Sequence, residues 1–140
     1  MFMHSCSKNM DMQKTVFVDN FVIYTNINKM KYLKEQASTF VYGNLNIKAK
    51  SSGFKFDTFD LNCVQIKVNE NNSNMLYIDS IASVLTQAFE TKENIIDVDV
   101  YWSFNGDLEK ENINNLSFDL SYFDEKKCVN TSYEDMFGKR

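Results

Sequence analysis

Residues 74–104, NMLYIDSIASVLTQAFETKENIIDVDVYWSF, decide the fold expected for this chain. In the first half apolar residues recur at three- and four-residue steps, which predicts an amphipathic helix. Its inward face would hold Met75, Ile78, Ile81, Ala82, Leu85, Ala88 and Phe89. In the second half apolar and polar residues alternate, which is the period of a half-buried strand. Its inward residues would be Ile96, Val98, Val100, Trp102 and Phe104.

Length and composition indicate one globular domain. The chain has 140 residues and is 44% hydrophobic, with 12 Phe and 7 Tyr, and its apolar runs are too short for a membrane span. Residues 1–8 contain no apolar segment long enough for a secretory signal. We therefore expect a soluble, cytoplasmic protein without a membrane partner. Fourteen lysines against one arginine are typical of AT-rich coding, as in a low-GC bacterium, a phage or a virus.

The usual catalytic motifs are absent from the sequence. His4 is the only histidine, which argues against Ser-His-Asp and Cys-His chemistry. Four isolated glycines exclude a P-loop and a dinucleotide fingerprint. Cys6, Cys63 and Cys128 are an odd number at wide spacings, which predicts reduced thiols rather than a disulfide framework or a zinc site. We expect no cofactor, no bound metal and no enzymatic activity.

Residues 1–43 are expected to form an arm, a strand and a helix. Residues 1–13 have no periodic pattern and are expected to form a flexible arm. Residues 15–25 are rich in β-branched and aromatic residues, which predicts one long bent strand, with a hairpin at Asp19 and Asn20 as the alternative. Asn28 would cap a helix that ends at Gly43. Its apolar side would hold Met30, Leu33, Ala37, Phe40 and Val41.

The remaining segments predict a sheet. Short strands at residues 45–49, 54–56 and 64–68 should form a meander. The strand at 96–104 should pair with residues 116–122 around a polar loop. Residues 125–140 are expected to form a tail with a short helical turn near Tyr133. The predicted fold class is therefore α+β, with two helices packed on one face of a mainly antiparallel sheet in the order β-α-β-β-β-α-β-β, and a single domain over residues 14–124.

Charge is distributed unevenly and favours a protein partner. Residues 1–70 hold nine lysines against six acids, whereas residues 71–140 hold thirteen acids against six basic residues. The first hypothesis is a non-enzymatic protein-binding module, whose partner has a basic surface or is a second copy of the chain. The element order resembles the layout of small secretion chaperones, and immunity and inhibitor proteins are similar in size and acidity. The predicted interaction residues are Asp97, Asp99, Tyr101, Asp107, Glu109, Glu111 and Asp119.

The second hypothesis is a single-stranded nucleic-acid-binding domain. Residues 16–21, VFVDNF, and 53–59, GFKFDTF, resemble the two short motifs of RNA-recognition-motif domains. The resemblance implies that Phe17, Phe54 and Phe56 lie on an open sheet face and stack on bases. The sequence departs from the family at Ser52, where a basic residue is expected. With Phe54 and Phe56 inward instead, a weak polyanion surface would comprise Lys48, Lys50, Lys55 and Lys67.

The third hypothesis is a metal-dependent phosphodiesterase. Asp97 and Asp99 share one strand face, and Asp119 could lie opposite them across the predicted hairpin. Three convergent carboxylates would provide oxygen ligands for Mg²⁺ or Mn²⁺. A solvated polar strand face explains the same alternation more simply.

Overall fold

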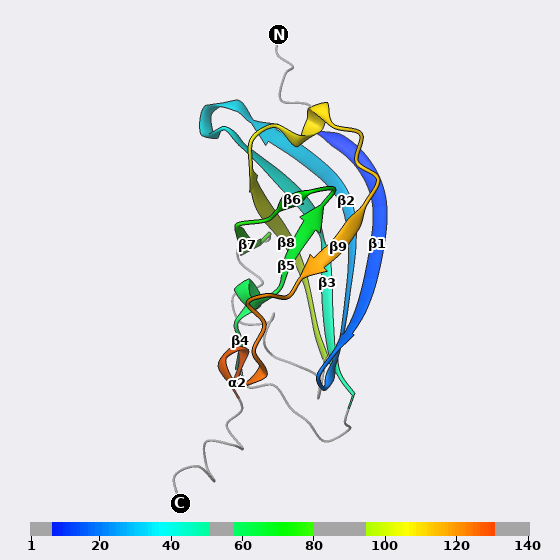
Figure 1. Cartoon of the computed structure of the whole chain (residues 1–140), viewed down its shortest axis with the longest axis vertical. Helices are drawn as coiled ribbons and strands as arrows, with labels where there is room; N and C mark the ends of the chain where they lie inside the picture. The colour runs from blue at the N-terminus through cyan, green and yellow to red at the C-terminus, as the bar shows by residue number, and fades with distance from the viewer. Residues whose placement is uncertain (1–6, 51–57, 80–94, 131–140) are drawn as a thin grey trace, which may run out of the picture.

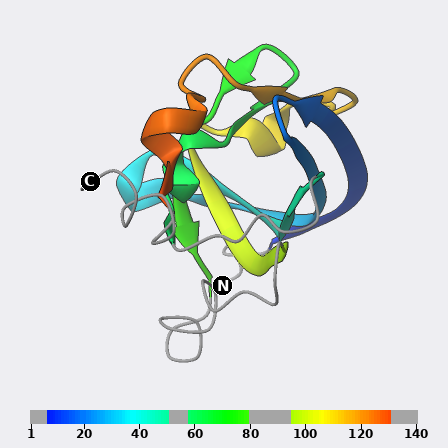
Figure 2. The ribbon, with the colours of Figure 1, turned by 90° about the horizontal axis from the view of Figure 1, so that it is seen from below.

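The computed structural model describes residues 7–50, 58–79 and 95–130, which form two antiparallel layers (Figure 1). The larger layer is a five-stranded sheet in the order β1-β2-β3-β8-β7. Its strands are β1 (Lys8–Val18), β2 (Phe21–Leu33), β3 (Ser38–Ala49), β7 (Met75–Ile78) and β8 (Ile95–Asn105). Seen from below, this sheet curves toward the smaller layer (Figure 2).

The smaller layer consists of a three-stranded sheet, β6-β5-β9, and a two-stranded sheet, β10-β4. Its strands are β4 (Thr58–Phe59), β5 (Gln65–Val68), β6 (Asn71–Asn72), β9 (Leu116–Asp119) and β10 (Val129–Asn130). These strands are short, and 3-10 turns and loops connect them. The smaller layer therefore acts as a cover over the inward face of the larger sheet.

β1 and β2 form a tight hairpin, which corrects the preferred prediction of one bent strand. Val18 pairs with Phe21, so Asp19 and Asn20 are the two loop residues. Asp19 has a φ of 52°, in the left-handed region that Asp tolerates better than most residues. The chain therefore reverses here without the glycine that such turns usually contain.

The segment between Asn28 and Gly43 is the far end of a second hairpin and not the predicted helix. Only Lys34–Gln36 are helical, as the 3-10 turn η1. Ile27 pairs with Gly43 and the next pair joins Lys29 to Tyr42, so Asn28 is the extra residue of a β-bulge. At the bulge the buried positions of β2 change from odd to even numbers, which conceals the strand period.

The second predicted helix begins instead as an edge strand, β7, in which Leu76 is buried and Met75 and Tyr77 are exposed. Residues 80–94, which contain most of that prediction, lie outside the described residues. Within the described ranges the one α-helix is α2 (Glu125–Cys128), and no helix packs on a sheet face. The α+β fold with two helices is therefore wrong, and the structure is mostly antiparallel sheet.

β8 is the strand predicted at residues 96–104, and its predicted inward residues are all buried. Its neighbours are β3 and β7. The predicted hairpin with residues 116–122 is wrong, because β9 pairs with β5 in the smaller layer. The loop after β8, which contains the 3-10 turn η3 (Leu108–Lys110), therefore crosses from one layer to the other.

Cys63 and Cys128 form a disulfide, which corrects the prediction of reduced thiols. Their Cα atoms are 6.2 Å apart although 65 residues separate them in sequence. Cys63 ends the 3-10 turn η2 (Leu61–Cys63), and Cys128 ends α2. The bond therefore fixes the carboxyl-terminal part of the smaller layer to the start of β5. Cys6 lies outside the described residues.

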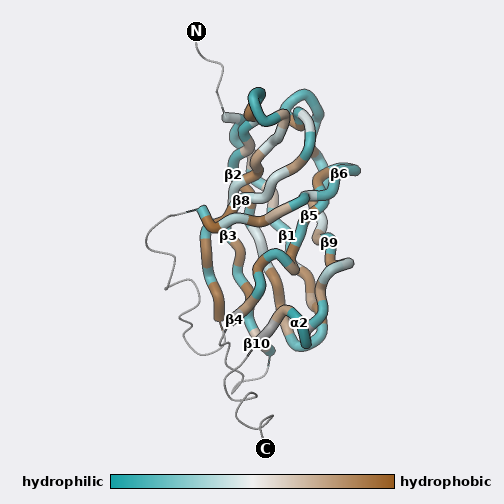
Figure 3. Tube along the Cα trace, turned by 90° about the vertical axis from the view of Figure 1, so that its left-hand side faces the viewer, coloured by the Kyte–Doolittle hydropathy of each residue, from teal (hydrophilic) through white to brown (hydrophobic). Residues whose placement is uncertain are grey.

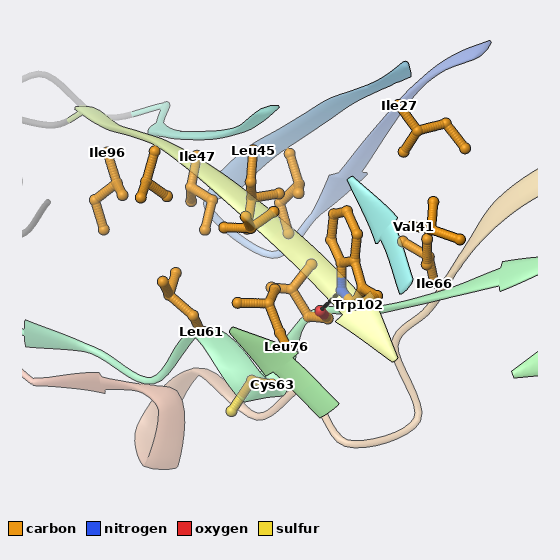
Figure 4. Close-up of a cluster of buried hydrophobic side chains, with 14 of the residues drawn as sticks. Ile27, Val41, Leu45, Ile47, Leu61, Cys63, Ile66, Leu76, Ile96 and Trp102 are labelled. Carbon is orange, nitrogen blue, oxygen red and sulfur yellow. Dashed lines mark hydrogen bonds between the residues drawn. The ribbon is translucent and has the colours of Figure 1, made fainter. Parts of the chain in front are cut away.

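The core lies between the two layers and is filled by aliphatic and aromatic side chains, of which Trp102 is the largest (Figure 4). Ile47 and Ile96 belong to the larger sheet, whereas Leu61 and Ile66 come from η2 and β5. Hydrophobic and hydrophilic residues alternate along the trace (Figure 3), as expected for strands with one buried face.

Several predicted boundaries differ from the described elements. β1 begins at Lys8, inside the segment predicted as an arm, and α2 and β10 lie inside the predicted tail. Predicted strands 45–49 and 64–68 correspond to the end of β3 and to β5. The predicted strand at 54–56 and the helical turn near Tyr133 fall outside the described residues.

In the described ranges, no helix is long and apolar enough to span a membrane.

Candidate functional site

The outward face of the larger sheet carries a row of three tyrosines. Tyr42 on β3 pairs with Tyr101 on β8, and Tyr101 pairs with Tyr77 on β7. The ring centroids are 5.1 Å apart at both steps, and the rings of Tyr77 and Tyr101 are 25° from parallel. Cross-strand aromatic pairs of this kind stabilise a sheet. This tyrosine row is built on three hydrogen-bonded strands and not on loops.

Further apolar side chains lie beside the tyrosine row. Phe40 precedes Tyr42 by two residues on β3, so it faces the same side, and its ring centroid is 4.9 Å from that of Tyr101. On β7, Met75 is 43% exposed and Tyr77 is 40% exposed. The five residues form what we call the aromatic face: Phe40, Tyr42, Met75, Tyr77 and Tyr101.

One end of the tyrosine row is covered by a cation from the same chain. Lys29 on β2 is opposite Tyr42 in the strand register. Its Nζ lies 4.6 Å from the centroid of the Tyr42 ring, within the range of attraction between a cation and a ring face. The row therefore starts at an ammonium group and ends at Tyr77 on the edge strand.

Carboxylates line the aromatic face on the side away from Phe40. Asp97 and Asp99 are exposed on β8, as predicted. Asn44 on β3 donates from Nδ2 to Asp97 at 2.8 Å and to Asp99 at 3.3 Å. Asp79 follows β7, and its backbone N–H donates to the backbone oxygen of Asp99 at 2.9 Å. We call Asp79, Asp97 and Asp99 the acidic strip.

The surroundings of Tyr42 and Tyr101 raise the pKa of both phenol groups. Burial raises the pKa of Tyr42 above its ordinary value of 10.0, and the charges of Asp79 and Tyr101 raise it further. Burial also raises the pKa of Tyr101, with Tyr77 and Asp79 adding to the effect. Negative charge nearby disfavours the phenolate form. Both phenols are therefore neutral hydrogen-bond donors at neutral pH.

The predicted acids of the loop after β8 have structural partners. Asp107 caps η3 by accepting a hydrogen bond from the backbone N–H of Glu109 at 3.0 Å. Glu109 in turn accepts from the backbone N–H of Tyr32 at 3.0 Å. Glu111 accepts from the side-chain amide of Asn71 at 3.3 Å. These three acids hold the crossover loop in place, and they are not part of the aromatic face.

Asp119 lies in the smaller layer, away from the acidic strip. It pairs with Gln65 on β5 and accepts hydrogen bonds from the N–H and hydroxyl of Ser121 at 3.1 and 2.6 Å. Asp97 and Asp99 belong to the larger sheet, so the structure does not bring the three predicted carboxylates together. Among the residues that the structure describes, no group of three His, Cys, Asp or Glu could hold a metal ion.

The predicted lysine and phenylalanine surface is divided between the layers. Phe17 on β1 is 67% exposed, and the Nζ of Lys50 lies 5.6 Å from its ring centroid. Lys48 is exposed on β3, whereas Lys67 is half-buried on β5 in the smaller layer. The other predicted residues lie outside the described part of the chain: Phe54, Lys55 and Phe56.

A hollow of about 460 Å³, lined by both polar and apolar side chains, lies beside the disulfide. In its wall, Gln65 donates to the backbone oxygen of Asn62 at 2.8 Å and accepts from Ser73 Oγ at 2.6 Å. Asn62 Oδ1 accepts from the backbone N–H of Leu76 at 2.8 Å. Within the described residues, no buried side-chain polar atom lacks a hydrogen-bond partner. The hollow therefore offers no unpaired buried group that would bind a ligand.

Sequence reasoning found part of the aromatic face. It predicts Tyr101 and its two neighbouring acids as outward residues of β8, and the structure places them there. It misses Tyr42 and Tyr77, because both lie inside the two segments that it predicts as helices. Every odd-numbered residue from 39 to 49 is buried in β3. Had the sequence been interpreted with this strand period, Phe40 and Tyr42 would have been predicted on the outward face of the sheet.

The fold and this surface define a small antiparallel β domain with an aromatic sheet face. No protein-family model, curated protein or solved structure gives a significant match to the chain.

Proposed function

We propose that this chain is a non-enzymatic protein-binding module, comparable in size and acidity to inhibitor, immunity and chaperone-like proteins, and that the aromatic face is its binding surface. The observation that carries the proposal is the exposure of Tyr77 and Met75 on the edge strand, next to two further tyrosines whose rings lie side by side. Tyr, Phe and Met are enriched in protein interfaces. Their collection on one sheet face supports docking of another protein.

The rigidity of the aromatic face supports the same proposal. The strands beneath it bury Val41, Val100 and Trp102 completely, so the backbone under the tyrosine row rests on close-packed core. Side chains that are held before binding lose less conformational entropy when a partner docks. The acidic strip adds negative charge, which favours a partner with a basic surface and speeds its association.

The test compares partner capture by a binding-face variant with capture by a matched control. The binding-face variant carries Met75→Ala and Tyr77→Ala, both at exposed positions of β7. The control is Phe17→Ala, at a 67% exposed aromatic residue on β1, the opposite edge strand of the larger sheet. We expect a stoichiometric protein that co-purifies from the host with the wild type and the control and is lost from the binding-face variant. Equal recovery by all three proteins, or no stoichiometric partner under several conditions, contradicts the proposal.

One observation favours a second candidate function, binding of single-stranded nucleic acid. Phe17 is exposed with Lys50 over its ring, and an aromatic ring beside a cation can stack on a base and neutralise a phosphate. We expect a single-stranded oligonucleotide to bind more weakly as salt increases, and Phe17→Ala to weaken binding severalfold. Binding that is absent, or flat across a salt titration, removes this candidate.

The disulfide and the sequence favour different cellular locations. A cytoplasmic location stays a prediction from the sequence, whereas the Cys63–Cys128 bond favours an oxidising compartment. Rapid alkylation of free thiols in intact cells, followed by peptide mapping, separates the two. Alkylated Cys63 and Cys128 support the cytoplasm, and protected cysteines support an oxidising compartment.

A further inference from the structure

The two ends of the tyrosine row are not equivalent. Tyr101 has a ring neighbour on each side, Tyr42 and Tyr77. The other side of Tyr42 is occupied by the Lys29 ammonium at 4.6 Å. Tyr77 is the last ring, it is 40% exposed, and no strand of the described residues lies beyond β7. Tyr77 is therefore the end of the row with a partly exposed ring and no cation of the described residues over it.

The charge near Tyr77 favours a cation. Asp79 follows β7 directly, and its backbone N–H donates a hydrogen bond to the backbone oxygen of Asp99. Asp79 is exposed and lies two residues after Tyr77, so strand alternation places both on the same sheet face. Its charge also contributes to the raised pKa of Tyr42 and Tyr101. Lys29 is on β2, which β3 and β8 separate from β7. The exposed ring of Tyr77 thus lies on the acidic side of the sheet.

The edge of β7 is partly closed to an added strand. The backbone N–H of Leu76 already donates to Asn62 Oδ1 at 2.8 Å. An extended peptide that paired along all of β7 would have to displace this bond. A partner therefore meets Tyr77 through its side chains, over the sheet face, rather than by extending the sheet.

We infer that the partner of the aromatic face presents an arginine side chain that stacks on the exposed ring of Tyr77 and pairs with the Asp79 carboxylate. This inference rests on the proposed function and names the chemistry of the partner. Arginine fits better than lysine, because its planar guanidinium stacks on a ring and can donate two parallel hydrogen bonds to a carboxylate. Lys29 on Tyr42 shows the same kind of contact within the chain.

The probe is a blocked peptide, acetyl-Gly-Arg-Gly-Arg-Gly-amide, and its control is the same peptide with citrulline, which keeps the shape but lacks the charge. Binding is followed by NMR on full-length protein with ¹³C-labelled tyrosine rings. We expect saturable shifts of the Tyr77 signal with the arginine peptide and none with the citrulline peptide. Tyr77→Ala and Asp79→Asn should each weaken binding about two- to fivefold. Asp11→Asn, at an exposed acid on β1, should leave binding unchanged.

Four results would overturn the inference: no shift of Tyr77, equal binding of both peptides, unchanged binding to Tyr77→Ala, or unchanged binding to Asp79→Asn. The partner capture experiment then shows whether the proposed function fails as well. If the binding-face variant loses its protein partner while the arginine peptide does not bind, the aromatic face is a binding surface with a different chemistry. If partner capture is also unaffected, both proposals fall.

Discussion

Trp102 on β8 donates its indole N–H to the backbone oxygen of Val64, 2.9 Å away, and so joins the two layers across the core. Val64 lies between η2 and β5, and both residues are fully buried. A buried carbonyl oxygen that loses its hydrogen-bond donor is left unpaired and still carries the free-energy cost of its removal from water. The single tryptophan is therefore both a large core side chain and a polar link between the layers.

Replacing Trp102 with phenylalanine should lower the free energy of unfolding by about 2–4 kcal/mol, because it leaves a cavity and an unpaired Val64 oxygen. Urea unfolding followed by far-UV circular dichroism measures the change. Phe104→Leu is the control, since Phe104 is fully buried on the same strand and its replacement removes ring volume without removing a hydrogen bond. A loss for Trp102→Phe that is no larger than the loss for Phe104→Leu contradicts the polar role.

Gly43→Ala should destabilise the sheet by about 1–3 kcal/mol, because the new Cβ has no room. It would lie 2.3 Å from the backbone oxygen of Asn26 and 2.9 Å from Cα of Ile27, at the bulge of β2. Gly106→Ala is the comparison: Gly106 has a φ of +86° with no atom within 4 Å of an added Cβ. Its cost comes from backbone conformation alone, about 1 kcal/mol. Thermal unfolding measures both changes. A smaller drop in the midpoint for Gly43→Ala than for Gly106→Ala would contradict the steric explanation.

Reduction of the Cys63–Cys128 disulfide should lower the free energy of unfolding by about 4 kcal/mol, the chain-entropy value for a loop of this length. The bond closes a separation of 65 residues. Unfolding with and without a reductant measures the effect, and a Cys63→Ala/Cys128→Ala variant should match the reduced wild type. A Cys6→Ser variant should respond to the reductant as the wild type does. Identical midpoints for the oxidised and reduced wild type would contradict the prediction.

Stability should fall as pH rises above 10, because the folded chain raises the pKa of Tyr42 and Tyr101 above 10.0. Below pH 10 both phenols are protonated in the folded and unfolded states, and the stabilising contribution is complete. Above it the unfolded chain loses these protons first, so ionisation pulls the equilibrium toward unfolding until the folded pKa is passed. Tyr42→Phe and Tyr101→Phe should each flatten the decline of the unfolding midpoint.

The control for this pH dependence is Tyr122→Phe, at a 70% exposed site outside the tyrosine row. It should leave the slope of the decline unchanged. A slope that is the same in Tyr42→Phe, Tyr101→Phe and the wild type would show that other groups cause the alkaline loss of stability.

The sequence predicts β8 well because its alternation runs without interruption from Ile95 to Asn105. It fails at β2 and β3 for a local reason. The bulge at Asn28 shifts the buried positions by one residue, and Ala37 closes the following turn with a φ of 50° where a turn would usually have glycine. These two irregularities leave a spacing of apolar residues that matches a helix.

The sequence predicts only those residues of the candidate site that lie together on one strand, β8. Asp97, Asp99 and Tyr101 follow from the alternation of β8. Tyr42 and Tyr77 join them through the pairing of β3 and β7 with β8, and register between strands far apart in sequence is not contained in a local pattern. The disulfide is hidden for the same reason, because only the folded layers bring its two cysteines together.

The pairing of β3 with β8 has a consequence for synthesis of the chain. β1, β2 and β3 pair with their neighbours in sequence and can close as soon as residue 49 is available. The free edge of β3 must then wait for β8, because Lys48 pairs with Ile95 and Ser38 with Asn105. At about 5–20 residues per second, a nascent chain presents the unpaired backbone edge of β3 for several seconds. A translation stop before residue 95 would leave that edge permanently exposed, as a substrate for chaperones or a nucleus for aggregation.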